Sequence, residues 1–396
     1  MTAADQPLVA RMRGFGTTIF SEMTALALAN DAVNLGQGFP DEDPPEAMVA
    51  AATEAMRAGH NQYAPGPGVP RLRRAVAAHQ QHHHGLTFDP DTEVSVTFGA
   101  TEALAATLLA VCDPGDEVIV LEPTYDAYTA VLALAGATAV PVRLDPPDFA
   151  LDLERFAAAI TPRTRLVLLN TPHNPTGTVL DAATLDAIAD LCVEHDLLAL
   201  TDEVYEHLVY DGVHVPLASR PGMRERTVTV SSAGKTFSCT GWKIGWACTA
   251  PPLTDALRTT KQFLSFSGGT PLQHAVAVGL DADDTVFDGV RELHRRRRDR
   301  LVDGLRAADC EVRRPAGGYF ATLDVRDLGH DDGEAFCRWA PGAIGVAAVP
   351  VSAFVRDPDD TVRPLVRLAF CKPESVIEAG VDRLLDARNH APGARR

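Results

Sequence analysis

One lysine in this chain stands among unusually small neighbours. Lys235 follows Ser232, Ala233 and Gly234, directly after a stretch over 227–231 that is typical of a strand. Small neighbours let a bulky molecule approach the amine closely, and a lysine shielded from water has a lowered pKa and becomes a nucleophile. We therefore expect Lys235 to form a Schiff base with an aldehyde, rather than to be an ordinary exposed lysine.

Three polar residues that precede the lysine suit the edge of a pyridine ring. Asp202 ends a predicted strand over 197–201, and Tyr205 follows it by three residues. A carboxylate there can keep a pyridine nitrogen protonated, and a tyrosine hydroxyl can bond to the phenolic oxygen of the same ring. Asn174 lies between two prolines, whose stiff turn orients it toward that oxygen from the other side. With Lys235, these residues predict a site for pyridoxal phosphate.

The phosphate of this cofactor needs separate donors. A predicted strand over 93–98 runs into a helix, and the free N–H groups and positive dipole end of such a helix start bind phosphate. Lys243 can add a point charge and Ser232 a hydroxyl. The residues of the helix start are Gly99, Ala100 and Thr101. No G-x-G-x-x-G follows the first strand, which disfavours a dinucleotide site.

Two further residues are candidates for ligand contacts. Arg367 stands in an apolar strand, and a buried arginine must find an anion. A substrate carboxylate suits its bidentate geometry, and an internal salt bridge is the alternative. Tyr125 follows the end of a predicted strand over 117–121 and can stack on the cofactor ring.

The elements that must position these residues predict an α/β fold. Short apolar strands alternate with Ala- and Leu-rich helices, which indicates a mostly parallel sheet with helices on both faces and ligands beyond the strand ends. The predicted strands span 93–98, 117–121, 139–144, 165–169, 197–201, 227–231 and 244–248, and the helices between them span 101–111, 127–134 and 185–194.

The pattern of predicted helices and strands changes after about residue 280. A long charged helix and shorter strands indicate a second, smaller α+β domain, with which the N-terminal segment is expected to pack. The predicted helix spans 290–307 and the predicted strands span 319–323 and 366–370; the large domain covers 41–285, and the small domain combines 1–40 with 286–396.

Composition narrows the class of protein. Lys and Arg total 36 against 53 Asp and Glu, so the net charge of −17 argues against nucleic acid as a partner. The 7 cysteines include no C-x-x-C pair, which fits reduced thiols in a cytoplasm. The first residues show no secretion signal, and no apolar run reaches the ~20 residues of a membrane span. We expect a soluble cytoplasmic enzyme without a membrane partner.

Two charged or titratable runs are assigned no chemistry. The run His82-His83-His84 lacks metal-ligand spacing and acidic or thiol partners, so we expect a solvated turn and no metal site. The arginines of 295–298 lie beside Glu292 and Asp299, which predicts a salt-bridged surface.

Together these motifs resemble the class I aminotransferases of pyridoxal-phosphate fold type I over residues 14–385. The resemblance is carried by the segments 34–41 (NLGQGFPD), 61–63 (NQY), 201–205 (TDEVY) and 232–237 (SAGKTF). They are similar to two subgroups, the kynurenine/glutamine aminotransferases and the actinobacterial N-succinyldiaminopimelate aminotransferases. The segments 173–175 (HNP) and 241–246 (GWKIGW) are more similar to the second.

The resemblance implies a homodimer with active sites at the subunit interface. It implies that Tyr63 reaches the partner's cofactor phosphate, that Gly38 contacts substrate through its backbone, and that Phe20 and Phe266 form an aromatic pocket. The implied reaction moves an amino group from an amino acid to a 2-oxo acid such as 2-oxoglutarate. N-succinyl-diaminopimelate is one candidate donor. The alternative is a broad kynurenine, glutamine and methionine aminotransferase with β-lyase activity on cysteine conjugates, and a specialised pathway stays open.

Overall fold

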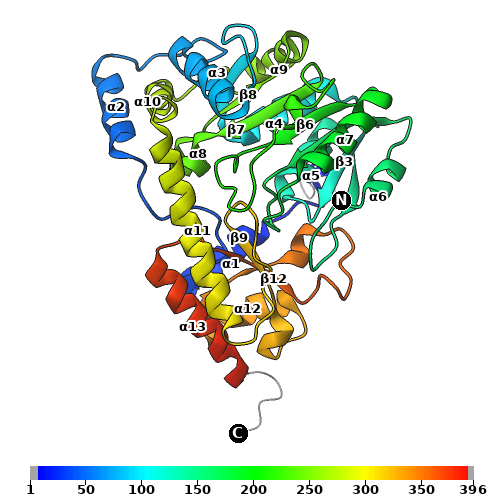
Figure 1. Cartoon of the computed structure of the whole chain (residues 1–396), viewed down its shortest axis with the longest axis vertical. Coiled ribbons are helices and arrows are strands. Elements are labelled where there is room, and N and C mark those ends of the chain that lie inside the picture. The colour runs from blue at the N-terminus through cyan, green and yellow to red at the C-terminus, as the bar shows by residue number, and fades with distance from the viewer. Residues whose placement is uncertain (1–7, 391–396) are drawn as a thin grey trace.

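A seven-stranded sheet organises the larger part of the molecule in the computed structural model, which describes residues 8–390 (Figure 1). β8 is antiparallel to both of its neighbours, and every other neighbouring pair is parallel. In order across the sheet, the strands are β2 (Val94–Phe98), β8 (Ile244–Cys248), β7 (Thr227–Ser232), β6 (Leu198–Asp202), β5 (Thr164–Asn170), β3 (Glu117–Glu122) and β4 (Thr138–Arg143). All seven predicted strands are confirmed to within one residue at each end.

Helices cover both faces of this sheet because its strands are apolar on both sides. In β3, Val118 and Val120 pack toward α4 and α5, whereas Ile119 and Leu121 pack on the other face toward α6 and α7. The helices of this part are α2 (Glu46–Arg57), α3 (Pro70–His84), α4 (Gly99–Val111), α5 (Asp126–Ala135), α6 (Leu153–Ala158), α7 (Ala182–Glu194), α8 (Ala233–Thr236), α9 (Pro251–Leu264) and α10 (Thr270–Leu280).

The predicted helices of this part begin one to three residues earlier than expected. For α7 the reason is a side-chain cap, since the carboxylate of Asp181 accepts a hydrogen bond from the backbone N–H of Thr184. For α4 the reason is a glycine: Gly99 has φ +65° and lets the chain turn from β2 into the helix without a linker. The start of α4 also packs directly on β8, since a Cβ on Gly245 would lie 2.5 Å from the carbonyl carbon of Gly99.

A second, smaller group of elements lies below the sheet in Figure 1. It holds an antiparallel sheet in the order β11-β12-β9 and a parallel pair of β1 with β10. Its strands are β1 (Val33–Asn34), β9 (Phe320–Asp324), β10 (Val346–Ala347), β11 (Val349–Pro350) and β12 (Leu365–Ala369), and its helices are α1 (Ile19–Ala29), α11 (Asp284–Arg306), α12 (Gly333–Ala343) and α13 (Glu374–His390). Short 3-10 turns complete the chain: η1 (Ala10–Met12), η2 (Leu217–Ser219), η3 (Thr240–Trp242), η4 (Val325–Leu328) and η5 (Val351–Phe354).

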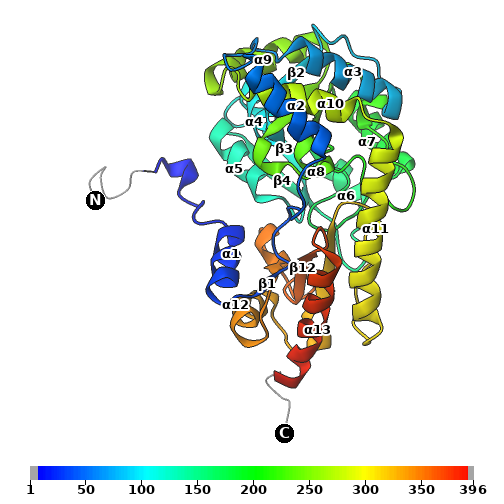
Figure 2. The same cartoon turned by 90° about the vertical axis from the view of Figure 1, so that its left-hand side faces the viewer.

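The described part of the N-terminal segment joins these C-terminal elements, as the sequence predicts. Val33 pairs with Val346 in the parallel pair, and α1 packs beside α12 (Figure 2). The predicted strands over 319–323 and 366–370 correspond to β9 and β12, and the long charged helix is α11, which begins at Asp284. The proposed domain bounds stay a prediction, and their outermost residues, 1–7 and 391–396, lie outside the described range.

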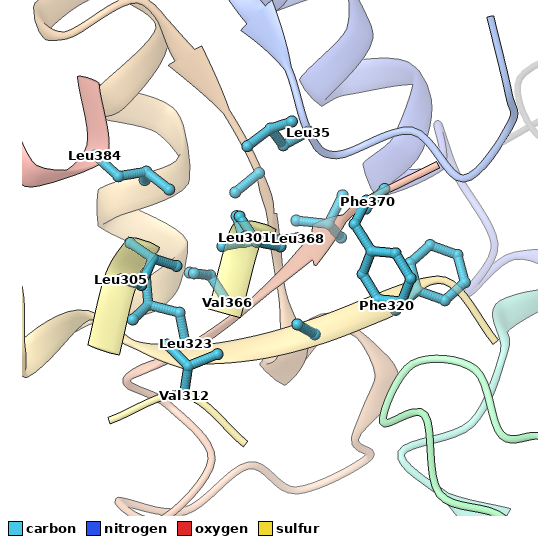
Figure 3. Packing of buried hydrophobic residues seen from close by; sticks show 14 of the residues in the cluster. Leu35, Leu301, Leu305, Val312, Phe320, Leu323, Val366, Leu368, Phe370 and Leu384 are labelled. Atoms are coloured by element: carbon cyan, nitrogen blue, oxygen red, sulfur yellow. The ribbon is translucent and has the colours of Figure 1, made fainter. Parts of the chain in front are cut away.

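The core of this second group fixes the orientation of β12. Val366 and Leu368 face a cluster that includes Leu301 and Leu305 of α11 (Figure 3). Because side chains alternate along a strand, Arg367 between them points to the opposite side, toward the end of the large sheet.

The expectation of a solvated turn at His82–His84 is wrong. These residues form the last turn of α3, which is capped by Gly85 in the left-handed conformation. His84 is buried and its Nε2 lies 2.6 Å from an oxygen of Glu206, and His82 contacts Asp284 at 2.8 Å. The acidic partners were missed because both lie more than 100 residues further along the chain.

The arginines of 295–298 on α11 form salt bridges, as predicted, but two of the four have buried side chains. Arg297 pairs with Glu42, and Arg298 pairs with Asp211 and Asp299. The side chains of both arginines are about 5% exposed, so these ion pairs connect α11 to the segments around it. No helix within residues 8–390 has the length and apolar character that a membrane span requires.

Candidate active site

A cavity of about 380 Å³ lies where the carboxyl ends of the parallel strands meet the smaller group of elements. It contains every predicted site residue except Tyr63 and Phe266. Those brought together are Phe20, Gly38, Gly99, Ala100, Thr101, Tyr125, Asn174, Asp202, Tyr205, Ser232, Lys235, Lys243 and Arg367. Ligand sites at this edge are expected for parallel sheets.

Lys235 projects into the cavity from α8, one turn beyond the end of β7. Its Nζ donates to the backbone oxygen of Gly38 at 3.3 Å and lies 5.7 Å from the centre of the Tyr319 ring. Burial lowers the pKa of Lys235, because the charged ammonium loses its hydration. An amine with this pKa has a larger neutral, nucleophilic fraction than a surface lysine.

Asp202 faces the same cavity from the end of β6. Its carboxylate accepts a hydrogen bond from the hydroxyl of Tyr128 at 2.7 Å, and its backbone oxygen accepts one from the amide of Asn170 at 2.8 Å. Burial raises the pKa of Asp202 to about 6. A cationic ring nitrogen beside this carboxylate would favour its ionised form. Tyr205 lies three residues on, and burial raises its pKa as well.

Arg367 enters from β12 and contacts Asn174, in the loop that follows β5 of the large sheet. Its Nη1 donates to Oδ1 of Asn174 at 2.9 Å, and its Nη2 donates to the backbone oxygen of Gly36 at 2.6 Å. The guanidinium also lies 4.0 Å from the centre of the Phe320 ring. Burial lowers the pKa of Arg367 to about 10, which leaves it charged at neutral pH.

This buried charge has no carboxylate partner within residues 8–390. Arg367 is 1% exposed, and its Nε donates to no group in that range. The internal salt bridge, which was the alternative interpretation of this residue, is not formed by any described residue. An anion that enters the cavity is therefore strongly favoured at Arg367.

The other end of the cavity brings together donor groups that could hold a second anion. Lys243 adopts a left-handed conformation, with φ +54°, and its Nζ is 3.2 Å from the position of a Cβ on Gly99. The free N–H groups at the start of α4 and the hydroxyl of Ser232 lie at the same end. Tyr125 precedes α5, and its ring lies 5.4 Å from that of Tyr128.

Tyr63 and Phe266 lie together outside the cavity. Their rings are 5.6 Å apart and nearly perpendicular, and the residues are 79% and 45% exposed. Thr270 joins the two segments, because its hydroxyl donates to the backbone oxygen of Gln62 at 2.8 Å. Within one chain, these two predicted residues do not reach the site.

Several residues that line the cavity were not predicted. Asn170 could have been found, because it ends β5 in register with Asp202 on β6. Tyr128 stands in the first turn of α5, three residues after the predicted Tyr125. The remaining unpredicted lining residues, which carry no chemical signal in the sequence, are Gln37, Phe39, Leu104, Val204, Gly234, Thr240, Ile244 and Phe320.

Comparison with known proteins agrees with this geometry. Residues 30–384 match the family described as "Aminotransferase class I and II". This chain belongs to that family. It is therefore an enzyme, an aminotransferase of fold type I, as the motifs around Lys235 predicted.

Several relatives match this aminotransferase over nearly its whole length. It is 50% identical over 387 residues to the probable N-succinyldiaminopimelate aminotransferase of Mycobacterium tuberculosis, with 95% of this chain and 97% of the relative covered. The solved structure of the Mycobacterium tuberculosis N-succinyldiaminopimelate aminotransferase has a TM-score of 0.94 at 51% identity, covering 96% of this chain and 100% of the other. The methionine aminotransferase of Escherichia coli is 40% identical over 383 residues, with 96% and 99% covered.

The raised pKa of Asp202 predicts a pH dependence of stability in the cofactor-free aminotransferase. The pKa is about 6 in the folded protein against an ordinary 3.8, so between these pH values the folded protein holds a proton that the unfolded chain releases. The free energy of unfolding contributed by Asp202 then falls by about 3 kcal/mol as the pH rises through this window. Asp202→Asn removes this loss, so urea unfolding should show a stability advantage of the variant that grows from about pH 4 to pH 6.

The exposed Asp190 provides the matched control. Asp190→Asn should follow the wild-type stability at every pH. An Asp202→Asn advantage that does not change with pH would contradict the raised pKa.

Proposed function

We propose that this aminotransferase binds pyridoxal 5'-phosphate on Lys235 and moves an amino group from an amino acid to a 2-oxo acid. One observation carries the proposal. A nucleophilic amine, a buried carboxylate and a buried guanidinium that has no carboxylate partner among residues 8–390 line the same cavity. These are the groups that an aldehyde, a pyridine nitrogen and an α-carboxylate require.

The residues present fit this cofactor. The start of α4, Lys243 and Ser232 would hold its phosphate, and Asp202 would face its ring nitrogen. Asn174 and Tyr205 would bond to its phenolic oxygen, and Tyr125 would stack on the ring. The missing side chain of Gly245 is part of the fit, because it lets the phosphate-binding helix start pack against β8. When bound, the cofactor supplies an electron sink that stabilises negative charge on the substrate Cα.

The protein's own groups would then carry out binding and proton transfer. Arg367 binds the α-carboxylate, and its hydrogen bond to Asn174 fixes the plane of the guanidinium. Lys235, released by the incoming amine, would remove the proton from the substrate Cα and then deliver this proton to the carbon of the cofactor's former aldehyde group. Its lowered pKa suits this general acid–base role. Phe20 and Phe320 flank Arg367 and exclude water from the bound carboxylate.

The candidate amino donors follow from the relatives. The 50% identity to a probable N-succinyldiaminopimelate aminotransferase supports N-succinyl-diaminopimelate as the donor, and we propose 2-oxoglutarate as the acceptor. The 40% identity to a methionine aminotransferase supports methionine as a donor. Methionine belongs to the alternative proposal, a broad enzyme for kynurenine, glutamine and methionine. A β-lyase activity on cysteine conjugates shares Lys235, Asp202 and Arg367, and release of pyruvate without any amino acceptor would reveal it.

We further propose a homodimer whose sites are shared between subunits. The exposed pair of Tyr63 and Phe266 adjoins Phe263 and Leu264, which are 84% and 50% exposed. A cluster of exposed apolar side chains of this kind marks an interaction surface. In the dimer, Tyr63 would bind the partner's cofactor phosphate and Phe266 would contribute to the partner's substrate pocket. The seven cysteines are all buried and free, which supports a cytoplasmic location.

Lys235→Ala tests the central role of the lysine. Loss of the nucleophile and proton carrier should lower turnover by ~10³-fold or more, while the circular dichroism spectrum and Tm stay close to wild type. Borohydride reduction of the wild-type holoenzyme should attach the cofactor to the peptide that contains Lys235, as read by mass spectrometry. A variant that keeps a tenth of the wild-type rate would contradict the role of Lys235. So would attachment of the reduced cofactor to Lys243, Lys261 or Lys372.

A hybrid dimer tests the shared site. When a Lys235→Ala chain is paired with a Tyr63→Phe chain, one of the two sites combines native Lys235 from one subunit with native Tyr63 from the other. Doubly tagged hybrids should therefore show about half of the wild-type turnover at limiting cofactor, whereas the Tyr63→Phe homodimer binds cofactor about tenfold more weakly. A hybrid with only half the activity of the Tyr63→Phe homodimer would place Tyr63 in its own subunit's site.

A panel of half-reactions tests the donor. Purified holoenzyme without acceptor is mixed singly with N-succinyl-diaminopimelate, kynurenine, glutamine, methionine or glutamate, and the absorbance of the bound cofactor is followed. We expect N-succinyl-diaminopimelate to react fastest, with the others slower by about a hundredfold, a difference of about 2.7 kcal/mol in transition-state binding. Comparable rates for several donors would instead establish the broad enzyme, and no reaction with any donor would indicate a specialised substrate.

A further inference from the structure

Three histidines meet outside the active-site cavity. His79 and His83 lie one turn apart on α3, and His207 lies in the segment that follows β6. One ring nitrogen of each is within 4.8 Å of the corresponding nitrogens of the other two. None of the three lines the cavity around Lys235, and the proposed reaction uses none of them.

The geometry of the group is close to that of a metal site. Nε2 of His79 and Nε2 of His207 are 2.7 Å apart, and the ring of His83 lies 4.6 Å and 4.8 Å from the rings of His79 and His207. In tetrahedral zinc sites with Zn–N distances of ~2.0–2.1 Å, two ligand nitrogens lie about 3.3 Å apart. The His79–His207 pair would need to open by about 0.6 Å, which small rotations of the two rings provide.

The surroundings favour a cation and leave it a route from solvent. His79 and His207 are buried, whereas His83 is partly exposed. The carboxylate of Glu206, next to His207 in the chain, accepts one hydrogen bond from the hydroxyl of Ser231 and lies 2.6 Å from Nε2 of His84, so it places negative charge beside the group. The ring of Phe287 packs 4.4 Å from that of His207 and closes the group on its apolar side.

We propose that His79, His83 and His207 form a binding site for one divalent transition metal ion, with zinc the best match. Three imidazole nitrogens and one water on the exposed side of His83 complete a tetrahedron. The expectation of no metal considered the run 82–84 by itself. The ligands are instead His79 and His83, at i and i+4 on a helix, and a third histidine more than 120 residues further on.

A metal here would connect α3 to the segment that carries the active-site carboxylate. His207 follows Asp202 by five residues, and the backbone between them is held by turns such as Leu208 N–H to Tyr205 oxygen at 2.7 Å. Binding to the folded state alone stabilises that state by mass action. The ion would therefore support the position of Asp202 and Tyr205 without entering the reaction.

An exposed group nearby must be distinguished from this site. His82, His83 and Asp284 also lie within reach of one ion, but His82 and Asp284 are exposed and contact each other at 2.8 Å. Since the two groups share His83, replacement of His82 affects only the exposed group, and replacement of His207 affects only the proposed site. The two variants therefore form a matched pair.

The test uses zinc chloride and the untagged holoenzyme after dialysis against EDTA. Calorimetric titration and elemental analysis should show one zinc per chain, and saturating zinc should raise the Tm by about 2 °C or more. His83→Gln and His207→Gln should each weaken zinc binding by about tenfold or more, while His82→Gln binds as wild type. The Tm of each variant without zinc establishes that it is folded, and the partly exposed His83 keeps the test valid if His207→Gln does not fold.

Three results would overturn the proposal. Zinc affinity unchanged in His83→Gln or in folded His207→Gln would exclude these ligands. Binding lost in His82→Gln and retained in His207→Gln would assign the ion to the exposed group. A wild-type affinity weaker than about 1 mM would leave His79 and His207 as a hydrogen-bonded pair without a metal.

Discussion

The active site depends on the buried positive charge of Arg367, which no carboxylate among residues 8–390 neutralises. Burying a guanidinium is costly unless its N–H groups are satisfied, and Arg367 obtains only partial compensation. It donates to Asn174 and Gly36, and it lies over the rings of Phe20, Phe320 and Phe354. These groups come from the N-terminal segment, the large sheet and the smaller sheet, so the charge is at the junction of all three. In the function proposed above, the remaining imbalance favours the binding of a substrate carboxylate.

Two further ionisable groups of the cavity, Lys235 and Asp202, also have shifted pKa values. Burial lowers the pKa of Lys235 and raises that of Asp202, so each is moved toward its neutral form. The hydroxyl of Tyr128 and the charge of Lys235 partly offset the effect on Asp202. A ligand with an aldehyde, a basic ring nitrogen and an anionic group would relieve all three residues at once. The cavity is thus organised around the charges of its ligand rather than around its own ion pairs.

The sequence alone was sufficient to predict the strands of the sheet and most of the chemically important residues of the cavity, and the reasons are physical. Strands buried on both faces are apolar throughout, so their limits are easy to recognise, and parallel strands bring Asp202 and Lys235 to one edge. What it could not provide were contacts between distant segments. Tyr128 and Phe320 reach the cavity through packing. His84 was assigned to a turn because its partner Glu206 lies far along the chain. Phe266 does not line the cavity of its own chain.

The pairing of β1 with β10 has a consequence for biosynthesis. Val33 hydrogen-bonds into the backbone beside Val346, and Arg367 donates to the carbonyl of Gly36. On the ribosome, the N-terminal segment therefore has no strand partner until most of the chain has been translated. The large sheet, whose strands all lie between residues 94 and 248, can assemble before that point. A nascent chain would thus carry the carboxylate and the lysine in place while the substrate carboxylate still had no arginine to bind, and apolar residues such as Met23 and Leu35 would need shielding in the meantime.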